Sequence, residues 1–284
     1  MADFRTLDNI IKLVSVEYLP PMLAAFIVGV VFSGGITRHL QIIFGLISVT
    51  FLVFGFNSYN AIYDKDIDRI NKPTRPLPSG RLNNRKAFNM TILFFLISLI
   101  FGLLINYTFL LIDFVGIGLA VLYSHPSTYL KRHYFVSTMI GNLTFAVIYP
   151  LEGWSINTSF AIPWYIILFL LFIGFGTSAL KDFEDIAGDK KNNIGTLAVK
   201  HGHNNAAKLV ALIFFCSLLI VLGLIVFRIF DIRYIVLSVF IIIATFNAFF
   251  LSKDERKHIS RKAFIFGVTL LTLVCICLIM LKLL

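Results

Sequence analysis

Long apolar runs, each bounded by charged or turn residues, constrain this sequence more than any other feature. They fall at 13–32, 40–61, 90–105, 109–123, 136–151, 162–180, 209–227, 232–251 and 263–281. A helix rises about 1.5 Å per residue, so roughly 20 residues cross a hydrocarbon layer about 30 Å thick. We therefore expect an all-α integral membrane protein with about nine transmembrane helices.

The composition agrees with this expectation. Of the 284 residues, 58% are hydrophobic and only 14% are charged, and a soluble globule of that composition would expose too much apolar surface. The three cysteines lie inside apolar runs, with neither metal-site spacing nor the look of a disulfide framework. Because no low-complexity linker interrupts the chain, we expect a single transmembrane domain over residues 1–284.

The basic residues are distributed unevenly among the connections. The N-terminal segment and the connections after the second, fourth, sixth and eighth spans hold 21 of the 25 Lys and Arg residues. By the positive-inside rule, these segments and the N-terminus are predicted to be cytoplasmic. Membrane topology and anionic lipid headgroups then explain the net charge of +10, and nothing in the sequence resembles a nucleic-acid-binding module.

An acidic segment follows the second span, in a connection near 61–89. If the helix continues past the membrane surface, Asn60, Asp64 and Asp68 at i, i+4 and i+8 share one face. Carboxylates one turn apart repel each other, and the helix C-terminus adds to the repulsion, so the arrangement favours a divalent cation or a basic ligand. Asp66 lies on the other side of the helix, between Lys65 and Arg69, and is predicted to be solvated or salt-bridged.

A second acidic segment follows the sixth span, in a connection near 181–208. Asp182, Asp185 and Asp189 at i, i+3 and i+7 again share a face, and Glu184 is expected to point away from it. Both segments end even-numbered spans, so they lie on one side of the membrane. Carboxylates and substrate phosphate oxygens are the ligands that Mg²⁺ prefers, which predicts a site that clamps one diphosphate through metal ions.

The same polar residues are also compatible with different roles. Either acidic segment taken alone is typical of a solvated helix end. A transporter is the rival class, although its ionisable residues are expected near the middle of a span, within broken helices. We expect Asp113 and Glu152 to lie at the membrane interface, and Glu17 to lie near the inner end of the first span, where it could reach a cavity.

The order and spacing of these motifs resemble a known family. The run from Asn60 to Gly80 is similar to the N-x-x-x-D-x-x-x-D motif of the UbiA superfamily of intramembrane prenyltransferases, with its trailing N-K-P-x-R-P-x-P-S-G. Asp185-x-x-x-Asp189, followed by Gly-Thr-Leu, resembles the second aspartate motif of that family. The two motifs are separated by the four helices expected, so the resemblance covers essentially the whole chain.

The resemblance implies a ring of helices around a central cavity, capped by the connections near 61–89 and 181–208 and open laterally to lipid. It implies a transferase that moves a polyprenyl group from a prenyl diphosphate to a hydrophobic acceptor, on the cytoplasmic side of the bilayer. Two or three Mg²⁺ ions, with Mn²⁺ as a substitute, are expected as cofactors. The implied metal ligands are Asn60, Asp64, Asp68, Asp182, Asp185 and Asp189, of which Asp64, Asp68, Asp185 and Asp189 are the catalytic residues.

Further residues are implied to bind substrate. Lys72, Arg75 and Lys131 correspond to the diphosphate-binding basic residues, and Asn60, Asp182 and Tyr123 complete the set. Ser127 stands where some members have a tyrosine. The Tyr123-Ser-x-Pro pattern is similar to branches that use either an aromatic ring or a prenylated glycerol phosphate as acceptor. The same scaffold also serves terpene cyclases and prenyl diphosphatases, so these alternatives stay open.

Overall fold

The computed structural model describes residues 2–157, 162–254 and 256–284, and within them the regular structure is helical, without strands. The helices are α1 (Ala2–Val14), η1 (Val16–Tyr18), α2 (Leu19–Phe32), α3 (His39–Tyr63), α4 (Lys65–Asn71), α5 (Asn84–Ile105), α6 (Tyr107–Ser124), η2 (Leu130–Arg132), α7 (Tyr134–Leu143), η3 (Thr144–Ile148), α8 (Tyr149–Ile156), α9 (Trp164–Lys191), α10 (Leu197–His201), α11 (His203–Val226), η4 (Ile232–Val236), α12 (Leu237–Leu251) and α13 (Lys257–Leu283).

The expected membrane spans are present. Among the described residues, eight helices are long and apolar enough to cross a bilayer, with α7, η3 and α8 forming one of them. A ninth span is obtained if the pair 6–14 and 16–32, bent by 47°, is counted as one. The prediction of an all-α, multi-pass membrane protein is therefore confirmed, and several helices extend beyond the apolar runs into polar sequence.

Asparagine side chains fix the ends of the hairpin formed by α5 and α6. Asn83 caps α5 by accepting a hydrogen bond of 2.8 Å from the Lys86 N–H. Asn106 lies between the two helices and accepts a bond of 2.8 Å from the Phe109 N–H, which starts α6. Its amide also donates to the Ser155 carbonyl at 3.0 Å, so the same residue ties this turn to α8.

Helices α2 and α8 cross in backbone contact. A Cβ at Gly29 would lie 2.0 Å from the Pro150 oxygen, and one at Gly153 would lie 2.0 Å from the Phe26 oxygen. Only glycine allows this approach. The crossing brings the chain of α8 to the middle of the molecule, where Thr144 and Tyr149, at the two ends of the π-helical turn, line a central cavity.

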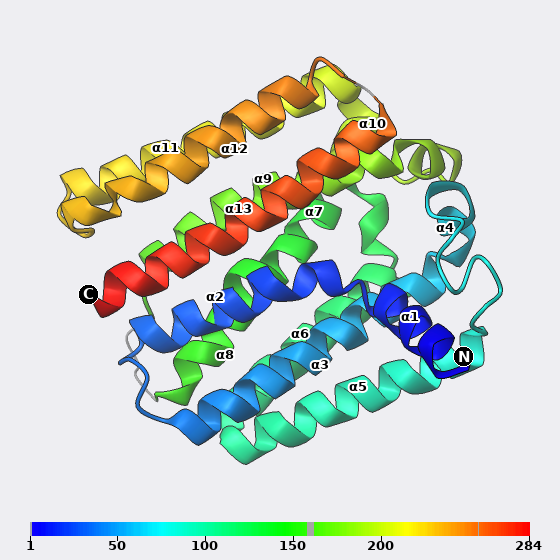
Figure 1. Cartoon of the computed structure of the whole chain (residues 1–284), viewed down its shortest axis with the longest axis horizontal. Coiled ribbons are helices and arrows are strands. Elements are labelled where there is room, and N and C mark those ends of the chain that lie inside the picture. Colours follow the sequence, from blue (N-terminus) through cyan, green and yellow to red (C-terminus); the bar gives the residue numbers. More distant parts are fainter. Residues whose placement is uncertain (1, 158–161, 255) are drawn as a thin grey trace.

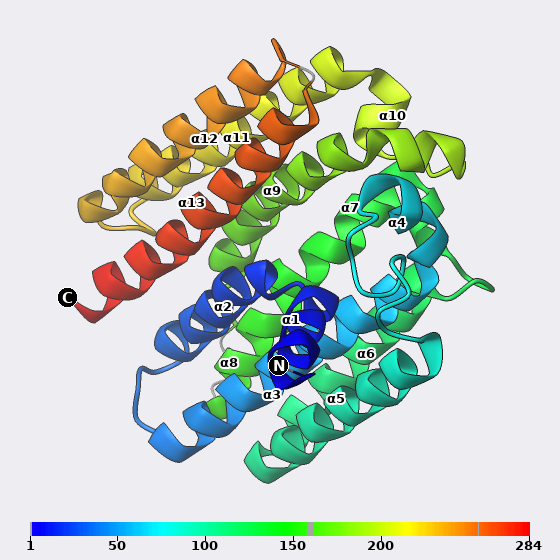
Figure 2. The same ribbon diagram turned by 45° about the vertical axis from the view of Figure 1, so that its right-hand side comes forward.

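The connections predicted to be basic gather at one end of the helical bundle (Figure 1). The N-terminus, α4 and α10 lie at that end, and the C-terminus lies at the other. The turned view shows α4 beside the end of α9, and α1 in front of α3 (Figure 2). Because α3 and α9 both end there, the fold brings the two acidic segments to the same side of the molecule.

Asp113 and Glu152 are not exposed at a membrane interface, so that prediction was wrong. Both side chains are fully buried, and they lie within hydrogen-bonding reach of each other. Asp113 also accepts hydrogen bonds of 3.0 Å from the hydroxyls of Ser48 and Ser98. These residues come from α3, α5, α6 and α8, so a polar cluster joins four helices. Asp113 therefore keeps hydrogen-bond donors in spite of its burial, whereas neither carboxylate oxygen of Glu152 has a hydrogen-bond donor among the described residues.

Candidate active site

The first acidic segment keeps its helical hydrogen bonds across a break. Helix α3 ends at Tyr63 and α4 begins at Lys65, so the helix does not continue unbroken as expected. The Asp64 N–H nevertheless donates to the Asn60 carbonyl at 2.9 Å, and the Asp68 N–H donates to the Asp64 carbonyl at 2.7 Å. The three residues therefore keep the one-turn spacing that places them along one side of the segment. Asp66 lies outside this set and pairs with Arg69 at 2.8 Å, as predicted.

The second acidic segment is the last part of α9. This helix runs unbroken from Trp164 to Lys191, so Asp182, Asp185 and Asp189 retain the predicted spacing. Asp182 Oδ2 and Asp185 Oδ1 are buried and have no hydrogen-bond partner. Two carboxylate oxygens that lack a donor in a buried place are unfavourable by themselves and favour binding of a cation.

Asn71 joins the two segments directly. Its amide nitrogen donates to the Asp185 carbonyl at 2.9 Å, and its amide oxygen accepts from the Gly188 N–H at 2.8 Å. A Cβ at Gly188 would lie 2.5 Å from the Asn71 amide, so glycine is required for this contact. Neither Asn71 nor Gly188 was predicted to be a site residue, although both lie inside the two aspartate motifs.

Basic side chains neutralise the acids. Lys72 Nζ lies 2.8 Å from Asp185 Oδ2 and 2.9 Å from Glu184 Oε1. Burial lowers the pKa of Lys72, but the neighbouring carboxylates, Asp185 above all, outweigh it and leave the pKa above the ordinary lysine value. Lys72 is therefore a cation held at the junction of both segments.

Arg75 and Lys131 are placed in the same way. Arg75 Nη1 lies 2.9 Å from Asp68 Oδ2, and Lys131 forms an ion pair with Asp64. The three basic residues selected from the sequence thus each contact a carboxylate of an acidic segment. Glu184 was expected to point away from the acidic face. Its side chain is buried between Lys72 and Arg261, at 2.9 and 3.3 Å, and it shares Lys72 with Asp185.

The donor set is suitable for a divalent cation, but it is not gathered into a single coordination sphere. Within the part of the chain that the structure describes, no three His, Cys, Asp or Glu side chains converge on one point. Mg²⁺ usually takes only one or two protein carboxylates and completes its shell with water and phosphate oxygens. The unpartnered oxygens of Asp182 and Asp185 meet that requirement.

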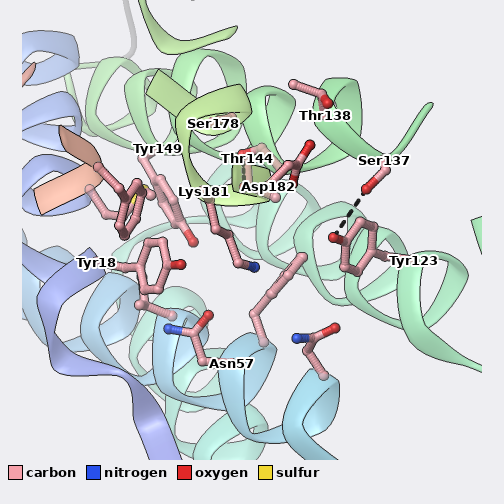
Figure 3. Close-up of a pocket in the computed structure, with 16 residues that line it drawn as sticks. Tyr18, Asn57, Tyr123, Ser137, Thr138, Thr144, Tyr149, Ser178, Lys181 and Asp182 are labelled. Carbon is pink, nitrogen blue, oxygen red and sulfur yellow. Dashed lines mark hydrogen bonds between the residues drawn. The ribbon is translucent and has the colours of Figure 1, made fainter. Parts of the chain in front are cut away.

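A cavity lies between the helices next to Asp182 of the second acidic segment (Figure 3). Asn60, Tyr123 and Asp182 line it, and the Tyr123 hydroxyl lies 3.4 Å from the Ser137 hydroxyl. Figure 3 shows Lys181 reaching from α9 into the space between Tyr18 and Tyr123. The Lys181 ammonium lies 5.7 Å from the centre of the Tyr18 ring. This half-buried cation lies next to the second aspartate motif but was not predicted to be a site residue. Its position at the end of an apolar span is the signal that marks it.

Comparison with known proteins agrees with this geometry. The sequence model for the UbiA prenyltransferase family matches residues 19–271, nearly the whole chain. The chain belongs to this family. The resemblance inferred from the motifs is therefore confirmed, and the protein is an intramembrane prenyltransferase rather than a transporter.

Individual UbiA family members are similar over most of their length. A digeranylgeranylglyceryl phosphate synthase of Methanosphaera stadtmanae is 29% identical over 80% of this chain and 83% of the relative. The protein of the same name from Methanococcus maripaludis is 34% identical over 75% and 77%. A UbiA homologue from Archaeoglobus fulgidus, solved with DMAPP and Mg²⁺, is 21% identical, covers 96% of this chain and 99% of its own, and has a TM-score of 0.73, which establishes the shared fold.

Proposed function

We propose that this UbiA prenyltransferase moves a polyprenyl group such as geranylgeranyl from its diphosphate to the free hydroxyl of a prenylated glycerol phosphate. The observation that carries the proposal is the contact between the two acidic segments, in which Lys72 bridges to Asp185 and Asn71 docks on Gly188. That contact supports a single diphosphate site rather than two separate surfaces. The names of the similar relatives support the glycerol phosphate acceptor.

In this proposal the carboxylates hold two or three Mg²⁺ ions, or Mn²⁺ as a substitute. Asp64, Asp68, Asp185 and Asp189 are the principal ligands, and Asn60 and Asp182 complete the set. When bound, the metal supplies Lewis-acid stabilisation of the departing diphosphate. The unpartnered oxygens of Asp182 and Asp185 support this assignment, as does the Mg²⁺ in the solved Archaeoglobus fulgidus homologue.

The basic residues have a second role in this scheme. Lys72, Arg75 and Lys131 each pair with a carboxylate of an acidic segment, so each lies where it would contact a diphosphate bound beside those carboxylates. The allylic C–O bond then breaks with its electron pair on the diphosphate. The acceptor oxygen forms the new C–O bond and releases its proton.

In this proposal the reacting carbon of the prenyl group lies in the central cavity. Tyr123 and Lys181 line it, together with Asp182 of the second acidic segment. Enclosure by helices limits the access of water, which otherwise captures an allylic cation. We place the acidic segments on the cytoplasmic side, because the basic connections gather at the same end of the bundle.

Product analysis tests the proposal. The purified protein is incubated with Mg²⁺ and labelled geranylgeranyl diphosphate, together with geranylgeranylglyceryl phosphate or with an aromatic acceptor such as homogentisate. A labelled diether phosphate is the expected product. A prenylated aromatic ring would refute the acceptor, free geranylgeraniol would indicate a diphosphatase, and a cyclic hydrocarbon would indicate a terpene cyclase.

A further inference from the structure

A second cavity, of about 460 Å³, lies at the acidic end of the bundle and is separate from the central one. Its wall comes from α1, η1, the segment after α4, the end of α9 and the first turns of α13. The charged side chains that line it are five basic residues and two acids, namely Lys12, Lys72, Arg75, Lys257, Arg261, Glu17 and Glu184. Positive charge therefore predominates.

Carboxylates neutralise the positive charges on the inner wall of this cavity. Glu184 lies between Lys72 and Arg261, and Arg75 pairs with Asp68. Lys257, on the outer wall, differs from these residues. Its ammonium donates to the backbone carbonyl of Asn71, and no carboxylate among the described residues lies within 4 Å of it. Since Lys257 has no carboxylate partner in the part of the chain that the structure describes, its charge is available to bind an anion.

The cavity is adjacent to the proposed diphosphate site. Lys72 lines the cavity and also binds Asp185 of the second acidic segment. Asn71, whose carbonyl accepts from Lys257, is the residue whose side chain docks on Gly188. Lys257 thus contacts the residue next to Lys72, and Lys72 is the side chain that bridges the two acidic segments.

A prenylated glycerol phosphate needs this arrangement. Its free hydroxyl and its phosphorus are separated by only a few covalent bonds, so the phosphate must lie close to the donor diphosphate during transfer. Two phosphate groups at short range repel each other unless fixed cations lie between or beside them. Lys257 and Arg261 line the same cavity as Lys72 and supply such charges, Arg261 while it is paired with Glu184.

We propose that Lys257 and Arg261 form the subsite that binds the phosphate of the acceptor. This inference rests on the proposed function, since it assigns a place to one of its two substrates. Lys12, which pairs with Asp8, adds a positive charge at the rim of the cavity. The carboxylate of Glu17 lines the same cavity and opposes binding of a phosphate there. The ligand class is a phosphate monoester on a lipid.

Steady-state kinetics test the subsite. Lys257→Gln and Arg261→Gln are compared with Lys262→Gln, because Lys262 neighbours Arg261 but lines a different groove, beside Asn247 and Phe266. We expect Lys257→Gln to raise KM for the acceptor about tenfold, with kcat and donor KM little changed. Arg261→Gln also raises donor KM, because it releases Glu184. An unchanged acceptor KM in Lys257→Gln, or an equal rise in Lys262→Gln, would overturn the assignment.

A binding measurement separates failure of the subsite from failure of the proposed function. Geranylgeranylglyceryl phosphate and the same lipid without phosphate are titrated onto the protein in neutral phosphatidylcholine nanodiscs. The wild type is expected to prefer the phosphorylated lipid about tenfold, and Lys257→Gln is expected to lose that preference. A preference without prenyl transfer would refute the function alone, and prenyl transfer without a preference would refute the subsite alone.

Bulk anionic lipid is a second source of the same phosphate chemistry. The titration is therefore repeated in nanodiscs that contain phosphatidylglycerol. If Lys257 and Arg261 select the acceptor, the preference persists in these nanodiscs. Loss of the preference would show that the cavity binds ordinary lipid headgroups, which contradicts the proposal.

Discussion

Lys72 Nζ lies 2.8 Å from Asp185 Oδ2, although the two residues are 113 positions apart in the chain. The bond joins the acidic segment after α3 to the acidic segment at the end of α9. Two hydrogen bonds between the Asn71 side chain and the α9 backbone stabilise the same contact. The two aspartate motifs are therefore parts of one surface, and changes on either side are expected to affect a common site.

Loss of a single motif carboxylate should nearly abolish turnover. We expect Asp68→Ala and Asp185→Ala each to lower kcat about 100-fold or more, because each removes a proposed metal ligand. The assay uses labelled geranylgeranyl diphosphate and a purified, folded protein. Asp66→Ala is the matched control, since its carboxylate is exposed and pairs with Arg69, outside the acidic face. Near-normal activity in both motif variants would refute the metal assignment.

Chelation should have the same effect as those substitutions. Excess EDTA is expected to stop prenyl transfer, and added Mg²⁺ to restore it, with Mn²⁺ giving partial recovery. The folded state should survive chelation, because Lys72, Arg75 and Lys131 neutralise the acids in the absence of metal. Thermal unfolding followed with and without EDTA checks this point. Full turnover in EDTA would exclude a metal-dependent reaction.

Lys72→Ala should act mainly on donor binding. The substitution removes a diphosphate-binding charge and leaves Glu184 and Asp185 without the ammonium that they share, so we expect donor KM to rise about tenfold. Lys65→Ala, which changes a lysine of the same segment outside the acidic face, serves as the control. Equal donor KM values for the wild type and Lys72→Ala would show that the residue is structural only.

Gly188→Ala should separate the two acidic segments. The new Cβ would lie 2.5 Å from the Asn71 amide, so Asn71 must move and its bonds to α9 must lengthen. We expect at least a tenfold loss of kcat and faster proteolysis after α4. Gly223→Ala is the control, because no atom lies within 4 Å of a Cβ at that position. Unaltered kinetics in Gly188→Ala would mean that this contact is dispensable.

The buried pair Asp113 and Glu152 should matter for stability rather than catalysis. Asp113→Ala removes the acceptor for the Ser48 and Ser98 hydroxyls and is expected to destabilise the protein by about 1–3 kcal/mol. Glu152→Gln should cost less, since its amide can donate to Asp113. The midpoint of thermal unfolding in detergent measures both. An exposed acid, changed as Asp231→Asn, provides the reference.

Local patterns in the sequence were sufficient for the spans and for the aspartate motifs. The length of an apolar run decides whether a helix crosses a bilayer, and a spacing of three or four residues decides which side chains share a face. Both properties depend on neighbours within one helix. For this reason, the positions of Asn60, Asp64 and Asp68 relative to one another could be predicted before the fold was known.

The partners of these residues across helices could not be predicted in this way. Asn71 docks on Gly188, Glu184 lies between Lys72 and Arg261, and Asp113 is buried beside Glu152 rather than exposed at an interface. Each of these contacts joins helices that are remote in sequence. The crossing of α2 and α8 and the packing of α9 determine them, because burial leaves each polar group to pair with whatever the neighbouring helix presents. The sequence by itself thus determined which residues are available for chemistry, and only the tertiary structure decided which of them meet.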